Sequence, residues 1–284
     1  MRRAHAGAQE GREHPGAVIR FVALALLTGA AIWEQVRPGV WQRESRMASA
    51  GALAPVRAVA VRIDPRRVAF SLGPLDHGRP WTIDSVGSVD AVAFNAGQFR
   101  TSGSWGWVVR DGVEIQAPGS GSVAMAFVVD SSGVPSLLEQ SEVSARRGHV
   151  RLAFQSYPAL LVGNGAVPWE LEESGRGVDL THRDSRLALG IRDDGSVIVV
   201  LTRFTGLGRG PGEMLPWGPT VLEMAAYMRS LGCRRAMLLD GGVSGQLAVR
   251  SQDGALRRWP NWREVPLGLV ATPLADAGSR GQSP

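Results

Sequence analysis

The clearest pattern of apolar and polar residues lies in the last quarter of the chain. Apolar residues recur at helical spacing over 222–231 and stop at Gly232, which predicts a helix with one broad apolar face. Thr220 and Glu223 stand three residues apart, which is the spacing of a capping box at a helix start. A short apolar run over 236–239 follows and predicts a buried strand.

An acid ends that predicted strand, and glycines follow it. Asp240 precedes Gly241 and Gly242, and Ser244 comes two residues later. Backbone without side chains can approach a ligand closely, so an acid at this position is typical of a binding or catalytic site. The Asp-Gly pair is equally typical of a simple turn, and the local pattern leaves both interpretations open.

Strand patterns occupy most of the chain before this region. Apolar runs or alternation predict strands at 56–63, 68–72, 89–94, 105–109, 113–115, 123–129, 150–154, 159–162, 186–191, 196–201, 247–250 and 267–271. Turn residues at 111–112 and 193–195 predict two hairpins, and 68–72 is expected to pair with 56–63. A weak helical pattern covers 136–146. The predicted fold class is mixed α/β (α+β), a single strand-rich domain with a mixed sheet and few helices, over residues 55–273.

The N-terminus has the order of a secretory signal. Arginines precede an apolar run that ends at Trp33. We therefore interpret residues 1–33 as a signal peptide or an N-terminal membrane anchor, with a buried helix as the alternative. Residues 34–54 are predicted to be a linker and 274–284 a disordered tail. The protein is expected to be extracytoplasmic, either periplasmic or secreted, and attachment to the membrane would run through this N-terminal segment.

Composition narrows the class of function. The net charge is +5 in 284 residues, and the chain has no basic stripe, so nucleic-acid binding is not predicted. The metal and phosphate motifs with fixed spacing are absent from the sequence. No metal or other cofactor is predicted, although a divalent cation stays open. The single cysteine, Cys233, is expected to be a small core residue.

Three polar loops each follow an apolar strand: 95–99, 155–158 and 240–244. If the three strands share a sheet, these loops meet at one edge. Arg186 opens a further strand and could hold an anion through two N–H groups, or form a surface ion pair with Asp184.

The ordered set of these motifs resembles the phosphodiester glycosidase family, the family of the lysosomal enzyme N-acetylglucosamine-1-phosphodiester α-N-acetylglucosaminidase. Residues 95–99 read Asn-Ala-Gly-Gln-Phe where the family typically has Asn-Gly-Gly-x-Phe, and 155–158 read Gln-Ser-Tyr-Pro where bacterial members have Gln-Ser-Gly-Pro. An Arg opens the strand at 186–190. The best match is Thr-x-x-Glu at 220–223 followed by Asp-Gly-Gly-x-Ser at 240–244. Ala96, Gln98 and Tyr157 depart from the family pattern.

The resemblance implies cleavage of a sugar from a phosphodiester-linked glycoconjugate or exopolysaccharide, with a carbohydrate or sugar-phosphate as substrate. In such a diester the leaving group is an acidic phosphate monoester, so one carboxylate could suffice. The implied catalytic residues are Asp240 as nucleophile or base, Arg186 on the phosphate, and Glu223, which the capping box also explains. The implied substrate-binding residues are Asn95, Gly97, Gln155, Ser156, Gly241, Gly242 and Ser244.

Two alternatives stay open at this point. His182 is either a second acid/base or a solvated loop residue. The whole domain is either a hydrolase or a non-catalytic carbohydrate-binding or envelope polysaccharide assembly protein that keeps the fold.

Overall fold

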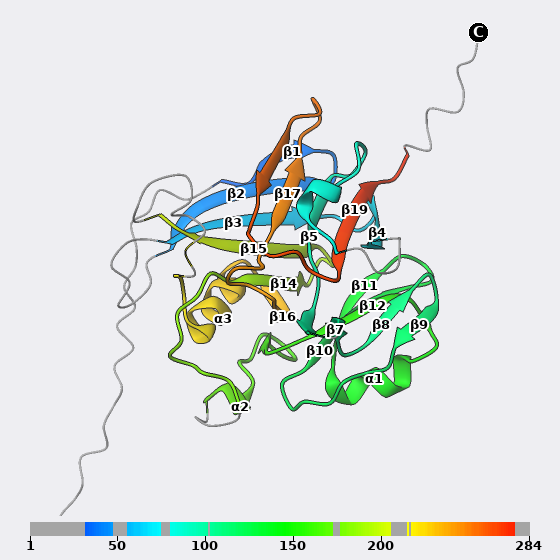
Figure 1. Ribbon diagram of the computed structural model, residues 1–284, viewed down its shortest axis with the longest axis vertical. Helices are drawn as coiled ribbons and strands as arrows, with labels where there is room; N and C mark the ends of the chain where they lie inside the picture. The colour runs from blue at the N-terminus through cyan, green and yellow to red at the C-terminus, as the bar shows by residue number, and fades with distance from the viewer. Residues whose placement is uncertain are drawn as a thin grey trace, which may run out of the picture. The chain divides into compact units, whose positions relative to one another are not determined.

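The computed structural model describes residues 32–47, 56–74, 80–101, 103–172, 177–205, 215 and 217–275. Within them the chain forms three larger β-sheets, one two-stranded sheet and three α-helices (Figure 1). Every strand pairing in these residues is antiparallel. The strand-rich fold with few helices is therefore confirmed, whereas the expected mixed sheet is not found.

A seven-stranded sheet carries the segment with Asp240. In order across the sheet, its strands are β1 (Glu34–Arg37), β2 (Val40–Met47), β3 (Val56–Ile63), β15 (Val197–Phe204), β14 (Leu187–Arg192), β16 (Cys233–Leu239) and β13 (Ala159–Leu161). Side chains alternate between its two faces, as strand geometry requires. On β3, for example, Val59 and Val61 face one core cluster while Ala58 and Ala60 face the other.

Two five-stranded sheets and a hairpin complete the β-structure. One contains β11 (Pro135–Glu139), β10 (Met125–Asp130), β12 (Val150–Ser156), β8 (Val108–Arg110) and β9 (Val113–Gln116). The other contains β18 (Leu256–Trp259), β17 (Leu247–Arg250), β5 (Val92–Asn95), β19 (Gly268–Pro273) and β4 (Val68–Gly73). Strands β6 (Gln98–Arg100) and β7 (Gly103–Trp105) pair with each other.

The main hydrophobic core lies where the three larger sheets meet. It takes Val59 and Leu189 from the seven-stranded sheet, Phe127 and Phe154 from the second, and Phe94 from the third, and all five are fully buried. Many neighbouring strands in these sheets are not consecutive in the sequence. The core therefore depends on contacts between segments that are distant in the chain.

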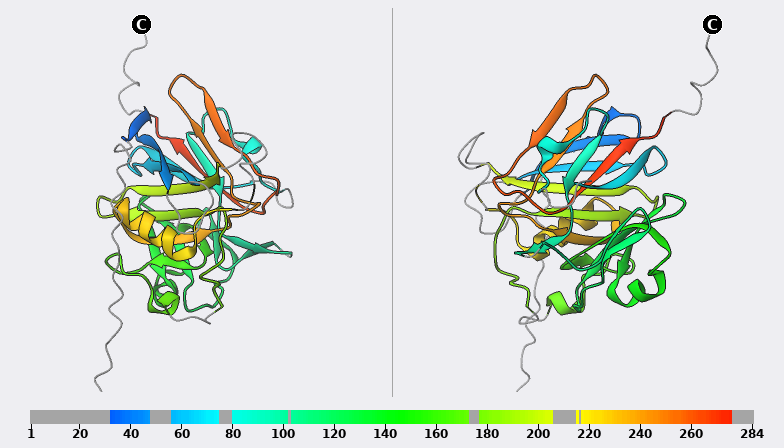
Figure 2. Two further views of the ribbon diagram at one scale, coloured as in Figure 1. Left: turned by 90° about the vertical axis from the view of Figure 1, so that its left-hand side faces the viewer. Right: turned by 45° about the vertical axis from the view of Figure 1, so that its right-hand side comes forward.

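Helix α3 (Val221–Ser230) covers the other face of the seven-stranded sheet (Figure 2). The predicted capping box is confirmed: Glu223 N donates to Thr220 Oγ1 and Thr220 N donates to Glu223 Oε2. Gly232 ends the helix with a φ of +85°, as expected for a glycine there. Cys233 follows it and is buried, which raises the pKa of its thiol to about 12.

The two remaining helices are short. Helix α1 (Gln140–Arg146) follows β11, and α2 (Trp169–Glu172) lies before 177–186; a 3₁₀ turn spans Ile83–Ser85. The predicted helix at 136–146 is therefore wrong in its first part, because residues 136–139 pair with β10. Strand pairing between distant segments outweighs the local helical pattern there.

The domain begins earlier in the chain than the sequence predicts. The linker at 34–54 is wrong for residues 34–47, because they form β1 and β2, and β2 pairs along its whole length with β3. Its polar residues are stabilised at the sheet surface, where Glu44 forms an ion pair with Arg57 at 2.8 Å. Residues 48–54 lie outside the described residues, as do 1–31 of the predicted signal or anchor and 276–284 of the predicted tail.

The observed strand pairing also tests the predicted hairpins and the predicted partner of residues 68–72. The hairpin at Asp111 and Gly112 is confirmed, and both residues have positive φ as a type I′ turn requires. The hairpin of β14 and β15 is confirmed as well. Strand β4 pairs with β19 and not with β3, so the predicted partner of 68–72 is wrong. In the described part of the chain, no helix is long and apolar enough to span a membrane.

Candidate active site

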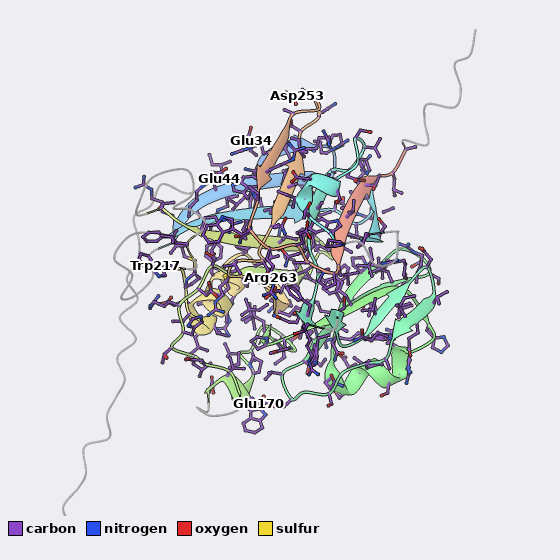
Figure 3. All side chains as sticks on the ribbon, in the orientation of Figure 1. Glu34, Glu44, Glu170, Trp217, Asp253 and Arg263 are labelled. Carbon is purple, nitrogen blue, oxygen red and sulfur yellow. The ribbon has the colours of Figure 1, made fainter. Side chains whose placement is uncertain are left out.

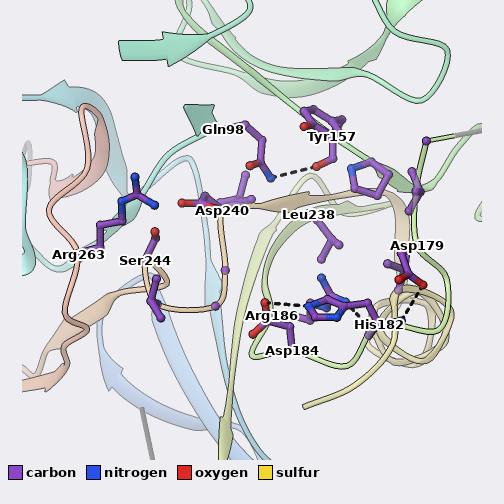
Figure 4. Close-up of a pocket in the computed structure, with 18 residues that line it drawn as sticks. Gln98, Tyr157, Asp179, His182, Asp184, Arg186, Leu238, Asp240, Ser244 and Arg263 are labelled. Carbon is purple, nitrogen blue, oxygen red and sulfur yellow. Dashed lines mark hydrogen bonds and ion pairs between the residues drawn. The ribbon is translucent and has the colours of Figure 1, made fainter. Parts of the chain in front are cut away.

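A pocket of about 360 Å³ opens where β16 ends (Figure 4). Three stretches line it: Leu238 to Ser244 from β16 and the loop after it, residues 177–186 before β14, and Tyr157 with Pro158 after β12. Gln98 of β6, Val221 of α3 and Arg263 from the loop before β19 complete the wall. The three polar loops predicted from the sequence do meet at this pocket. The strands before them, β5, β12 and β16, lie in three different sheets and do not share one.

Asp240 is fixed in this pocket through its own backbone. Its N–H donates to Gly97 O at 3.0 Å, and its carbonyl oxygen accepts from Asn95 Nδ2 at 2.7 Å. Burial raises the pKa of the Asp240 carboxyl, and a hydrogen bond from Ser244 and the positive charge of Arg263 act in the opposite direction. A carboxyl group that has a raised pKa and lines a pocket is a candidate for acid–base or nucleophilic catalysis.

Two residues predicted to bind substrate, Asn95 and Ser156, instead hold the backbone around the site. Asn95 is buried, and its Oδ1 accepts from Gln246 N at 2.8 Å while its amide holds Asp240. Ser156 is buried and donates from Oγ to Leu238 O at 2.6 Å. Their polar atoms are used inside the protein, so the predicted substrate contacts are not supported.

Gln155 is also turned away from the pocket. It is fully buried, and its Oε1 accepts from Trp107 N at 2.9 Å and from Gly119 N at 2.8 Å. Its Nε2 donates to Gln140 Oε1 at 2.7 Å. Gln155 therefore ties two loops of the second sheet to the first residue of α1, and its position does not support the role in sugar binding that the resemblance implied.

The glycines after Asp240 are required by close packing of two backbones. Gly242 N donates to Ser185 O at 2.7 Å, so this N–H is not available to a substrate as the sequence suggested. A Cβ on Gly241 would lie 2.4 Å from the same carbonyl oxygen. Gly242 has a φ of +51°. The loop after β16 therefore lies directly against the segment that enters β14.

That segment brings a second acid, Asp184, into the pocket. Its Oδ1 is buried without a hydrogen-bond partner, and its Oδ2 lies 3.7 Å from His182 Nε2. Burial raises the pKa of the Asp184 carboxyl, although the charge of Arg186, the Ser185 N–H and His182 oppose this rise. From the sequence, Asp184 was expected only as a surface ion-pair partner of Arg186. The sequence signal that could have found Asp184 is an acid near the end of a polar run, three residues before the first residue of the buried strand β14.

The two acids affect each other electrostatically. The negative charge of Asp184 further raises the pKa of Asp240. In Figure 4, Arg263 and Ser244 lie on one side of Asp240, and His182, Asp184 and Arg186 lie on the other. Three carboxyl groups therefore line the pocket, those of Asp179, Asp184 and Asp240, and a guanidinium lies on each side of Asp240.

Arg186 lies in the pocket wall as predicted, but much of its side chain is already engaged. Its Nε donates to Pro219 O at 3.2 Å and its Nη2 to His182 O at 2.7 Å. Burial lowers the pKa of its guanidinium, and the charges of Asp184 and Asp179 oppose this. The predicted contact with phosphate stays a prediction.

Glu223 does not line the pocket. Besides the helix cap, it accepts two hydrogen bonds of 2.9 Å from Arg183. These contacts give Glu223 a structural role at the start of α3. Its position outside the pocket does not support a catalytic role.

A conservative substitution tests that conclusion. Glu223→Gln keeps an oxygen that can accept from Thr220 N, so we expect kcat/KM to change by less than about twofold and the stability to fall by at most about 1 kcal/mol. Steady-state kinetics and thermal unfolding check this. A loss of about a hundredfold in kcat with an unchanged Tm would place Glu223 in the chemistry.

Among the residues that the structure describes, no group of three or more His, Cys, Asp or Glu side chains is arranged to hold a metal. The expectation of no cofactor stays a prediction.

Solved structures share this fold. The catalytic domain of zebrafish N-acetylglucosamine-1-phosphodiester α-N-acetylglucosaminidase, auto-inhibited by its pro-peptide, matches with a TM-score of 0.62 and 17% identity, over 86% of this chain and 87% of that one. A hypothetical protein from Synechocystis gives 0.56 and 14%, over 87% and 64%. A putative exported protein from Burkholderia pseudomallei gives 0.58 and 15%, over 80% and 76%. At these identities the likeness concerns the fold.

The sequence itself identifies the family. The family model of phosphodiester glycosidases matches residues 88–272, and the chain belongs to that family. A comparison with curated proteins gives no match. The matched range begins four residues before β5, ends within β19, and includes Asp184 and Asp240.

Proposed function

We propose that this protein is a hydrolase that cleaves the bond between a sugar and a phosphodiester group. The observation that carries the proposal is the pair of carboxyl groups, Asp184 and Asp240, which share one pocket and both have a pKa raised by burial. Paired acids of this kind serve glycoside hydrolysis, in which one carboxylate acts at the anomeric carbon. Family membership supports the same reaction.

In this proposal the bond between the anomeric carbon and the phosphate oxygen breaks, and a phosphate monoester leaves. Water supplies the hydroxyl group of the free sugar. Asp240 acts at the anomeric carbon, as nucleophile or as the base that takes the proton from water. We assign the second proton-transfer role to Asp184, because it lines the same pocket and its negative charge raises the pKa of Asp240.

Arg263 is better placed than Arg186 to hold the phosphate. Its charge acts on Asp240, its side chain is exposed, and its guanidinium rests on the ring of Phe99 at 4.9 Å. Arg186 already donates to two carbonyl oxygens. We assign Arg263 to the phosphate and Arg186 to the support of Asp184, where a fixed positive charge favours the ionised acid.

The pH dependence of turnover follows from the raised pKa of Asp240. The ionised form is required, so kcat/KM is expected to fall as pH falls through that raised pKa, above the ordinary Asp value of about 3.9. Arg263 lowers this pKa by its charge, so Arg263→Gln is expected to move the acid limb to higher pH. A pH–rate profile of both proteins checks this, and an unshifted limb in the variant would contradict it.

We propose further that the substrate is a phosphodiester-linked glycoconjugate or exopolysaccharide outside the cytoplasm. The basic residues and apolar run of the N-terminus support export, and one structure of similar fold is described as a putative exported protein. Fractionation of cells that produce the full chain tests the location. Recovery of the full-length protein in the cytoplasm alone would contradict it.

The reaction is tested with purified protein and a panel of sugars linked through α-1-phosphodiesters, beside the Asp240→Asn variant. Release of free sugar by the wild type alone is the expected result. Equal release by both proteins would move the chemistry away from Asp240. Sugar binding by both with release by neither would favour the non-catalytic carbohydrate-binding alternative.

A further inference from the structure

A second hollow of about 570 Å³ shares a lining residue, Arg263, with the pocket. Successive residues of β6 face the two spaces: Gln98 lines the pocket, whereas Phe99 and Arg100 line the second hollow. Arg263 lines both. In Figure 3, Arg263 lies near the middle of the view, away from the labelled residues of the periphery. A molecule bound at Asp240 can therefore extend past Arg263.

The second hollow is positively charged. Arg100, Arg110 and Arg263 line it, with Glu264 as the acid at the same wall. We call the surface of Phe99, Arg100, Arg110 and Arg263 the basic groove. Net positive charge on a concave surface attracts anions and raises their local concentration.

In the part of the chain that the structure describes, none of the three arginines of the basic groove forms an ion pair, although the guanidinium of Arg263 lies over the ring of Phe99. Other arginines of the protein, such as Arg57, Arg183 and Arg235, are each held in an ion pair with a glutamate. Arg110 Nε is buried without a hydrogen-bond partner. A buried donor without an acceptor is costly, so an acceptor from a ligand would relieve it.

From these observations we propose that the basic groove binds a second anionic group on the leaving side of the substrate, beyond the phosphate at Arg263. The substrate class is then a glycosyl phosphodiester whose aglycone carries another negative charge. This inference rests on the proposed function, because it describes the remainder of the same substrate. Guanidinium groups pair readily with phosphate and carboxylate oxygens, which fits such an aglycone.

Binding of leaving-group analogues to the full protein tests the groove without any need for turnover. The probes are propyl phosphate, 1,3-propanediol bisphosphate and 1,6-hexanediol bisphosphate, measured by calorimetry. We expect at least one bisphosphate to bind about tenfold more tightly than propyl phosphate, which corresponds to two partly exposed ion pairs. The difference should shrink as salt is added.

Arg100→Gln and Arg110→Gln, alone and together, are compared with Arg146→Gln, which removes an exposed arginine of α1 outside the groove. The double variant is expected to bind all three probes about equally, while Arg146→Gln keeps the preference. Arg100 is exposed, so Arg100→Gln should fold normally. It therefore still tests the groove if replacing Arg110 disturbs folding. Equal affinities for all probes in the wild type, or a preference that survives the double variant, would overturn the inference.

A turnover arm separates the inference from the function on which it rests. The sugar 1-phosphate is supplied as its propyl ester and as its 3-phosphonooxypropyl ester. Faster hydrolysis of the charged ester supports both. Hydrolysis of both esters at one rate refutes the groove and keeps the hydrolase, whereas preferential bisphosphate binding without hydrolysis refutes the hydrolase and keeps the groove as an anion site.

Discussion

Replacing Asp240 with Asn is expected to lower kcat by about a thousandfold, and replacing Asp184 with Asn by a similar factor. An amide can neither attack the anomeric carbon nor accept a proton from water. The backbone contacts that place Asp240, to Gly97 O and from Asn95 Nδ2, involve main-chain atoms that the substitution keeps. The loss should therefore appear in kcat, with the binding of substrate largely retained.

The same substitutions are expected to increase stability at neutral pH. A carboxyl whose pKa is raised on folding binds its proton more tightly in the native state than in the unfolded state. Stability therefore falls as pH rises from the ordinary Asp pKa through the raised one. Asn removes this penalty, and we expect a gain of about 1 kcal/mol at pH 7, or about 2–4 °C in Tm, that vanishes near pH 3.

Asp64→Asn is the matched control for this pair. Hydrogen bonds from Arg66 lower the pKa of the Asp64 carboxyl, so its ionised form stabilises the native state at neutral pH. The control should lose stability at pH 7 where the site variants gain it. Thermal unfolding at pH 3 and pH 7 checks the signs. Site variants that lose stability at pH 7, or that keep wild-type kcat, would contradict the account of the acid pair.

Arg203→Met is expected to lower stability by about 3 kcal/mol and Tm by about 6–12 °C. Arg203 is only 2% exposed. Its Nη2 donates to Gly245 O at 2.7 Å, to Pro260 O at 2.9 Å and to Trp259 O at 3.3 Å. Met has similar bulk without a donor, so these buried carbonyl oxygens lose a charged partner.

Removing the guanidinium of Arg203 is also expected to disturb the geometry of the active site. Gly245 belongs to the loop that carries Asp240 and Ser244, and Pro260 lies in the segment that leads to Arg263. Asn261 ties the same two segments, because its Nδ2 donates to Gly242 O at 2.6 Å. We therefore expect kcat/KM to fall about tenfold in the folded variant. Arg66→Met, at an exposed arginine of a turn, is the control, and an equal small effect of both substitutions would contradict this role.

Local elements were predictable from the sequence. The helix of α3, its cap at Thr220 and its end at Gly232 depend on neighbouring residues, and so do the hairpins that turn at Asp111 and at 193–195. Pairing between distant segments was not predictable in this way. Strand β2 carries many polar residues because it lies near the edge of its sheet, and its local pattern is that of a linker.

The site was predicted in position but only partly in composition. Asp240 and Arg186 line the pocket, as the motifs indicated. Asn95 and Gln155 carry the polar groups of a binding site, yet both are buried and hydrogen-bonded inside the protein, which sequence alone does not reveal. Asp184 was missed as a site residue because its burial arises only when the loop after β16 packs against it.

Hydrolysis in ¹⁸O-labelled water tests the central claim most directly, because it shows which bond is cleaved. If the acids of the pocket act at the anomeric carbon, mass spectrometry will find the label in the anomeric hydroxyl of the released sugar and none in the phosphate monoester. Label in the phosphate would show attack at phosphorus, and the protein would then be a phosphodiesterase and not a glycosidase.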